Sequence, residues 1–113
     1  MERSDTPAQI TDLHGLAPAA RQCIREALEQ LIGEAELSYD FYREWSGGWR
    51  CRVAVAGRAR GQLDFVLFHT PQGGILALPL PMPERWRVGP GIRASDGGMW
   101  TLDSDGQVVP ATG

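Results

Sequence analysis

The sequence contains no lysine, only two cysteines and two histidines, and no long apolar run. Without lysine it cannot supply the Gly-Lys-Ser/Thr end of a phosphate-binding loop. Cys23 and Cys51 are too few for a disulfide framework, so we expect two buried, reduced thiols. His14 and His69 are scattered without the spacing of metal ligands, and we expect neither a bound metal nor a cofactor.

No apolar run is long enough to cross a bilayer, and no signal peptide precedes the first predicted helix. We therefore expect a cytoplasmic protein. A chain of 113 residues can bury a real core, and we expect one domain over residues 1–113. The apolar fraction of 42% is ordinary for a folded protein.

Charge is unevenly distributed along the chain. The net charge of −3 argues against a general nucleic-acid binder. Residues 45–63 nevertheless carry no acid and four arginines, namely Arg50, Arg52, Arg58 and Arg60. With Tyr42 beside it, this arginine group predicts a site for an anion, a nucleic acid or an acidic partner. The alternative is that Asp40, Glu44 and Asp64 on neighbouring strands neutralise it.

Two helices are predicted before residue 34. Thr6-Pro7-Ala8-Gln9 is typical of a helix start, and this short leading helix would end near His14. A longer helix opens at Ala17-Pro18 and stops at Gly33. Its apolar residues fall on one face at spacings of three and four; they are Ile24, Ala27, Leu28, Leu31 and Ile32.

Between residues 36 and 80, apolar and polar residues alternate with the period of a half-buried strand. Four strands are predicted, over 36–45, 49–56, 62–69 and 75–80. In the first three, the apolar side chains fall mainly on odd numbers, as in Leu37, Tyr39, Phe41, Trp45, Trp49, Cys51, Val53, Val55, Leu63, Phe65 and Leu67. Opposed residues of an antiparallel pair share a face, so the turns must set odd residues opposite odd ones.

This parity predicts the first turn. A three-residue loop over 46–48, with glycine in its left-handed position, would pair Trp45 with Trp49 and set Glu44 opposite Arg50. A two-residue Gly-Gly turn would oppose apolar to polar residues throughout. We expect the longer helix to cover the odd-numbered face.

In the last two strands the even-numbered residues also become apolar, so half of the sheet is apolar on both faces. Such a surface needs a cover. The partner-binding candidates are Val66, Phe68, Leu76, Leu78 and Leu80, with Trp86 and Trp100 nearby in sequence. Two alternatives stay open: the C-terminal segment folds over this face, or the face docks a partner protein or a second copy of the chain.

After Leu80 the prolines at 81 and 83 end the fourth strand, because proline donates no backbone hydrogen bond. Residues 85–88 are predicted as a short strand, and residues 99–102 and 107–109 as a hairpin around an Asp-Ser-Asp-Gly turn. The predicted fold is therefore α+β. One main N-terminal helix and a short leading helix pack on an antiparallel four-stranded meander, with a C-terminal hairpin.

No reactive constellation is predicted. In the expected register His69 lies diagonal to Cys51 on one face, the components of a cysteine nucleophile, but a thiol under the helix would be inert. Asp103-x-Asp105-Gly matches part of a calcium loop without the later ligands, and a plain turn explains it. We expect no catalytic residue and no enzyme activity.

One segment resembles a known family. The run Leu-Ile-Gly-Glu-Ala-Glu-Leu-Ser at 31–38, followed by Gly48-Trp49-Arg50, is similar to part of the accessory proteins for nickel–iron hydrogenase maturation. There too a helix ends in a Gly-Glu-x-Glu turn that leads into a strand. The resemblance implies an accessory role in the maturation of a metalloenzyme.

Taken together, the sequence predicts a small non-enzymatic protein-binding module: an inhibitor, adaptor or accessory factor. It would act through the apolar sheet face, on a partner protein or as a homodimer. The alternatives are nucleic-acid or phosphate binding by the arginine group, and the maturation role that the resemblance implies.

Overall fold

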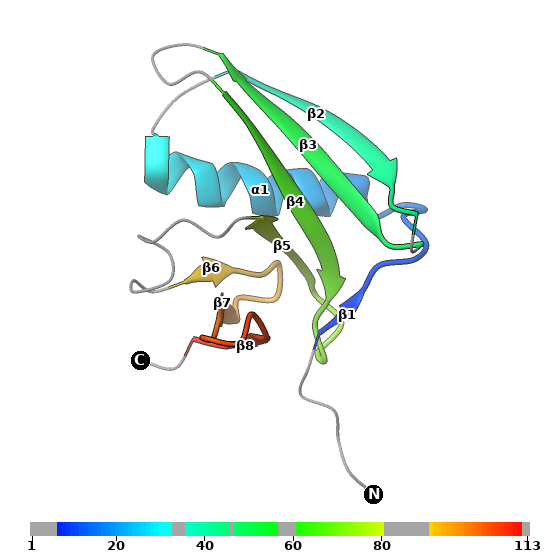
Figure 1. The fold of residues 1–113 in the computed structure, drawn as a ribbon, viewed down its shortest axis with the longest axis vertical. Helices are drawn as coiled ribbons and strands as arrows, with labels where there is room; N and C mark the ends of the chain where they lie inside the picture. The colour runs from blue at the N-terminus through cyan, green and yellow to red at the C-terminus, as the bar shows by residue number, and fades with distance from the viewer. Residues whose placement is uncertain (1–6, 33–35, 46, 57–60, 81–90, 112–113) are drawn as a thin grey trace, which may run out of the picture.

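The structure, a computed structural model, describes residues 7–32, 36–45, 47–56, 61–80 and 91–111. Over these residues it has the predicted α+β fold, with one helix and two antiparallel sheets (Figure 1). The elements, in chain order, are β1 (Ala8–Gln9), α1 (Ala17–Ile32), β2 (Glu36–Arg43), β3 (Trp49–Ala56), β4 (Gly61–His69), β5 (Ile75–Leu80), β6 (Ile92–Arg93), β7 (Met99–Leu102) and β8 (Val108–Pro110).

The helix α1 begins and ends where the sequence predicts. Its buried side chains recur at spacings of three and four, at Ala20, Cys23, Ile24, Ala27 and Leu28. On the exposed side, Arg25 and Glu29 form an ion pair of 3.9 Å one turn apart, which contributes only about 0.2–0.5 kcal/mol. The stability of the helix therefore rests on the packing of its apolar face.

The predicted short leading helix is wrong. Residues 8–9 instead form β1, and Ile10 continues it. The Ile10 N–H donates to the Leu67 carbonyl at 2.9 Å, and the Ile10 carbonyl accepts from the Trp49 N–H at 2.9 Å. These bonds satisfy the backbone N–H and carbonyl of Ile10 as a helix would. In this position the Ile10 side chain is also completely buried, which stabilises the strand further.

Strands β2, β3, β4 and β5 form the predicted antiparallel meander. The central strand β4 pairs with β5 along one side. Along its other side it pairs first with β3 and then, at residues 68–69, with β1. Strands β2 and β5 are therefore the two outer strands of the meander.

The predicted register of the first hairpin is wrong by two residues, although its parity is right. Arg43, not Trp45, faces Trp49, and Trp45 is fully exposed at 102%. The loop closes one residue earlier than predicted, and Gly48 stays beside the strand. Beside it, the Trp49 N–H donates to the Ile10 carbonyl, so pairing with the segment that continues β1 favours this register.

Four turns share one hydrogen-bond pattern. The first residue donates its N–H to the carbonyl four positions later, and its own carbonyl accepts from the N–H three positions later. The turns span residues 44–48, 70–74, 94–98 and 103–107. In each, the fourth residue is a glycine with positive φ, between 80° and 99°. This is the three-residue hairpin loop with a left-handed glycine that parity predicted for the first turn.

The odd-numbered face of the meander packs on α1, which crosses behind β3 and β4 in Figure 1. One hydrophobic cluster joins the buried helix side chains to Cys51, Val53, Phe65, Leu67 and Ala77. Tyr39 and Val53 lie directly opposite each other and so share this face, as parity requires.

A second sheet follows the meander, with strand order β6-β7-β8. Its β7–β8 pair is the predicted C-terminal hairpin. Strand β6 was not predicted, because two residues are too few to show a period. The Ser95 N–H donates to the Ile75 carbonyl at 2.9 Å, which ties this sheet to the outer edge of β5. The predicted strand at 85–88 lies outside the described residues.

Candidate functional site

The apolar even-numbered face is largely covered by the chain itself. Leu76 and Leu78 are 0% and 1% exposed, and Val66 and Trp100 are also buried. Leu76 and Leu78 share a cluster with Ile92, Trp100, Leu102 and Val108 of the second sheet. Of the two alternatives, the covering C-terminal segment is thus the one found for these side chains.

Two other partner-binding candidates stay accessible. Phe68 is partly buried against the core, and Leu80 is 39% exposed. Trp86 lies outside the described residues. Of the described apolar side chains on this face, a docking partner could therefore reach only Phe68 and Leu80.

Acids on neighbouring strands pair with the arginine group. Arg50 Nε lies 2.9 Å from Glu44, and Arg52 Nε lies 3.3 Å from Asp64. The hydrogen bond and charge of Asp64 raise the pKa of Arg52 further, and its guanidinium lies 5.1 Å from the ring centre of Tyr42. Arg58 and Arg60 lie outside the described residues. The charges of Arg50 and Arg52 are thus neutralised by neighbouring acids, which was the alternative to an anion-binding site.

The structure does not bring Cys51 and His69 together. Cys51 faces Phe65, whereas His69 lies at the far end of β4 and is exposed. Burial raises the pKa of both Cys23 and Cys51 to about 11, so the reactive thiolate is scarce at neutral pH. Cys23 also donates a hydrogen bond to the Arg93 carbonyl at 3.3 Å. These thiols have the character of core side chains.

The two outer edges of the meander differ. On β5, Ile75 bonds both backbone and side chain of Ser95, and Pro79 has no N–H to offer. On β2, no strand among the described residues pairs with the outer side. This edge is eight residues long, about 26 Å, and contains neither proline nor glycine.

The hydrogen-bond pattern identifies the free backbone groups of β2. In the adjoining turn, the Glu44 N–H donates to the Gly48 carbonyl at 2.7 Å. Alternation then directs the backbone groups of even-numbered residues in β2 toward β3. Those that point away from β3 belong to Leu37, Tyr39, Phe41 and Arg43.

Side chains give this β2 edge two different sides. On the odd-numbered side, Leu37, Tyr39 and Phe41 are only partly buried. On the even-numbered side, Glu36 and Asp40 are exposed, and neither forms an ion pair with another described residue. The edge thus combines an apolar strip with two exposed carboxylates, of which Asp40 lies opposite Arg52 of β3 without a close ion pair to it. The predicted meander already places this strand at one edge of the sheet. The prediction does not say which of the two outer strands other parts of the chain cover.

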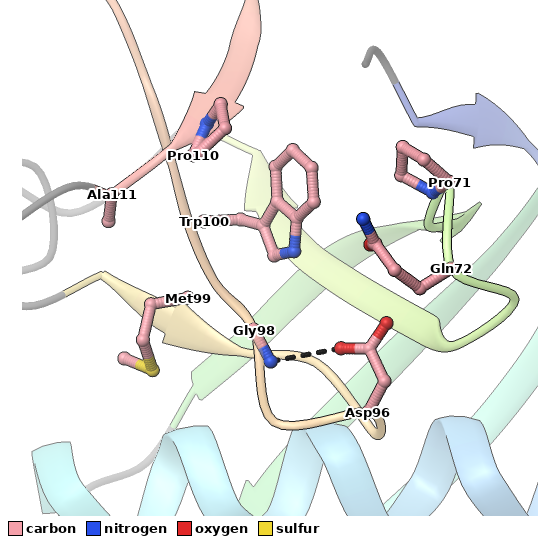
Figure 2. A pocket seen from close by; sticks show the side chains of 8 residues that line it. All are labelled: Pro71, Gln72, Asp96, Gly98, Met99, Trp100, Pro110 and Ala111. Atoms are coloured by element: carbon pink, nitrogen blue, oxygen red, sulfur yellow. Dashed lines mark hydrogen bonds between the residues drawn. The ribbon is translucent and has the colours of Figure 1, made fainter. Parts of the chain in front are cut away.

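A second feature is a pocket of about 510 Å³ between the turns at 70–74 and 94–98 and the end of β8 (Figure 2). Hydrogen bonds join the two turns at one carboxylate. Asp96 accepts from the Thr70 hydroxyl at 2.6 Å and from the Gly98 N–H at 2.9 Å. The Thr70 hydroxyl in turn accepts from the Gly74 N–H at 2.7 Å. We call Thr70 and Asp96 the turn clamp. No local sequence pattern points to this clamp, because its two residues lie 26 positions apart in separate turns.

The turn clamp predicts a pH dependence of stability. Its hydrogen bonds hold the pKa of Asp96 below the ordinary 3.8. A carboxyl with a lowered folded-state pKa contributes stability that is complete above its unfolded value and is lost as the pH falls through its folded value. The contribution of Asp96 should therefore be complete above about pH 5 and should decline as the pH falls below 3.8 toward the lowered folded value.

Thr70→Val tests this dependence. Thr70 is 4% exposed, and removing its hydroxyl leaves the Gly74 N–H without its partner, so we expect a loss of about 1–3 kcal/mol at pH 7. The part of the loss that comes from the hydrogen bond to Asp96 should shrink as the pH falls below 3.8, measured by urea unfolding at several pH values. Thr70→Ser keeps the hydroxyl and is the control. A loss independent of pH would contradict the role given to Asp96.

Among the described residues, no three or more His, Cys, Asp and Glu side chains gather as a metal site would require. Nor is any described helix long and apolar enough to cross a membrane. Comparisons with protein-family models, curated proteins and solved structures find no significant match to the chain.

Proposed function

We propose that this protein is a small non-enzymatic binding module that takes up an extended segment of a partner protein as an additional strand beside β2. The observation that carries the proposal is the eight-residue outer edge of β2, which no described strand covers. In strand addition, main-chain hydrogen bonds supply affinity and alternate side chains supply specificity.

The side chains of β2 suggest the chemistry of the partner. A strand opposite Leu37, Tyr39 and Phe41 would place apolar residues on the odd-numbered side. On the other side it would meet Glu36 and Asp40, which favour arginine or lysine. The occupant is therefore an extended segment that alternates basic and apolar residues. Trp45, exposed at the tip of the hairpin, offers a further apolar contact at one end.

A second copy of the chain fits this edge less well in the symmetric register centred on Asp40. That register sets Asp40 against its own copy and Glu36 against Glu44, and opposed like charges are destabilising. The register centred on Tyr39 avoids both clashes. A homodimer is therefore an outcome that the experiment must separate from a basic partner.

The arginine and maturation alternatives gain less support. Arg50 and Arg52 are already engaged with acids. Residues 33–35, at the centre of the resemblance to hydrogenase accessory proteins, lie outside the described residues.

The proposal predicts that an eight-residue capped peptide alternating arginine and valine binds, and that added salt weakens it. Asp40→Arg should reduce the affinity about threefold to tenfold, because it replaces an attractive charge pair with a repulsive one. Asp105→Arg changes the net charge equally on the exposed turn of the C-terminal hairpin and is the matched control. Fluorescence anisotropy of the labelled peptide measures both.

Backbone pairing has its own test. N-methylation of one alternate set of peptide amides should abolish binding, and methylation of the other set should leave it intact, because only one set faces β2. Equal effects of the two sets would contradict strand addition. A protein that sediments as a dimer, and as a monomer after Asp40→Arg, would assign the edge to a second copy instead.

A further inference from the structure

Trp100 presents a polar group without a partner at the pocket beside the turn clamp. Its side chain is 5% exposed, and Nε1 has no hydrogen-bond partner among the described residues. Figure 2 shows the edge of the indole that carries Nε1 turned toward Gln72 and Asp96. An indole N–H donates but cannot accept, and buried Trp N–H groups usually find an acceptor.

Because Gly98 has no side chain, a small space stays open beside this N–H. A Cβ at Gly98 would lie 3.2 Å from Oδ1 of Asp96 and 3.3 Å from Nε1 of Trp100. A donor and an acceptor therefore border the same small volume. Around it the walls are largely apolar, from Pro71, Met99, Pro110 and Ala111.

Asp96 is held in place and remains able to accept. Each of its oxygens receives one hydrogen bond, from Thr70 or from the Gly98 N–H, and each keeps a second lone pair. Its lowered pKa keeps it ionised at neutral pH. Among the described residues that line the pocket no other is charged, so the charge of Asp96 favours a cation.

We propose that this pocket binds an α-aminoacyl group, with the ammonium on Asp96 and the neighbouring carbonyl oxygen on Nε1 of Trp100. An ammonium and a carbonyl on adjacent carbons match a carboxylate and an N–H that border one small space. The side chain of the ligand would lie against the apolar wall. Gln72 is exposed, so it can change rotamer without disturbing the core and admit the carbonyl. This site is separate from the β2 edge.

The same chemistry occurs in a free amino acid derivative and at the N-terminus of a peptide. The probes are therefore alaninamide, trialanine and N-acetyl-alaninamide, which lacks the ammonium. The readout is the indole N–H signal of Trp100 in ¹⁵N-labelled protein, with the exposed Trp45 as internal control. So small a ligand should bind in about the millimolar range.

We expect alaninamide and trialanine to shift the Trp100 signal and leave Trp45 unchanged, and acetylation to weaken binding at least about tenfold. Tighter binding of trialanine would identify a peptide N-terminus as the source, and equal binding would identify the free group. No shift of Trp100 at about 50 mM, or equal binding of the acetylated probe, would overturn the proposal.

Gly98→Ala supplies the structural test, because its methyl group fills the space between the two polar atoms. Its φ is not positive, so alanine is compatible with the backbone. Trp100→Phe removes the N–H together with the five-membered ring but keeps an aromatic side chain, and it serves if the first variant folds poorly. Backbone amide shifts of the pocket should show at least about tenfold weaker binding in either variant. Unchanged binding in a folded variant would overturn the proposal.

Discussion

Leu78→Asp is expected to unfold the protein, or to cost at least about 4 kcal/mol in the free energy of unfolding. The Leu78 side chain is 1% exposed on the even-numbered face, beneath the second sheet. An aspartate there would bury a carboxyl without a partner, one of the few changes that destabilise so strongly. Thermal and urea unfolding of the variant measure the effect.

Leu80→Asp is the matched control, on the same strand and the same face but 39% exposed. It should cost less than about 1 kcal/mol, because the new carboxylate can reach water. Similar losses in the two variants would contradict the view that the second sheet covers one end of this face and leaves the other accessible.

Phe65→Ala is expected to cost about 3–5 kcal/mol, the range for a large side chain removed from a well-packed core. Phe65 is 0% exposed and lies under α1. Phe68→Ala, three residues along the same strand, should cost roughly half as much, since Phe68 is on the opposite face and only partly buried. Urea unfolding of both variants gives the comparison.

The order of these two losses matters more than their size. Both substitutions remove the same atoms from β4, so the difference reports the packing of the two faces. A larger loss at Phe68 than at Phe65 would mean that the even-numbered face holds the main core, which would contradict the packing of α1 on the odd-numbered one.

Much of the architecture could be predicted because period and parity are local properties of the sequence. The apolar spacing of α1 and the odd-numbered apolar residues of β2, β3 and β4 determine which side chains share a face, whatever the exact register. Glycine at the end of the three-residue loops likewise follows from the backbone alone.

The errors arise where distant segments meet. The start signal around Pro7 favours a helix locally, but pairing of Ile10 with both β3 and β4 outweighs it. The same pairing engages the Trp49 N–H beside the first turn, where the predicted register is wrong by two residues. No window of the sequence contains both ends of such an interaction.

The candidate sites follow the same rule. The residues of β2 and its outer position in the meander were predicted. The contrast with β5, whose outer side bonds to Ser95 at Ile75, depends on the second sheet, which was not placed. The turn clamp joins Thr70 to Asp96 across 26 positions, between two turns that look ordinary in the sequence. Conversely, the apolar residues Leu76 and Leu78 suggested a docking surface because the second sheet that covers them was not yet placed.

Hydrogen exchange of the β2 amides tests the proposed docking edge most directly. In the free protein, the outward amides of Leu37, Tyr39 and Phe41 should exchange rapidly, whereas those of Ser38 and Asp40, bonded to β3, should be protected. Adding the basic alternating peptide should protect the outward set. Outward amides already as slow as their neighbours in the free protein, or unchanged when the peptide binds, would show that this edge is not where a partner is received.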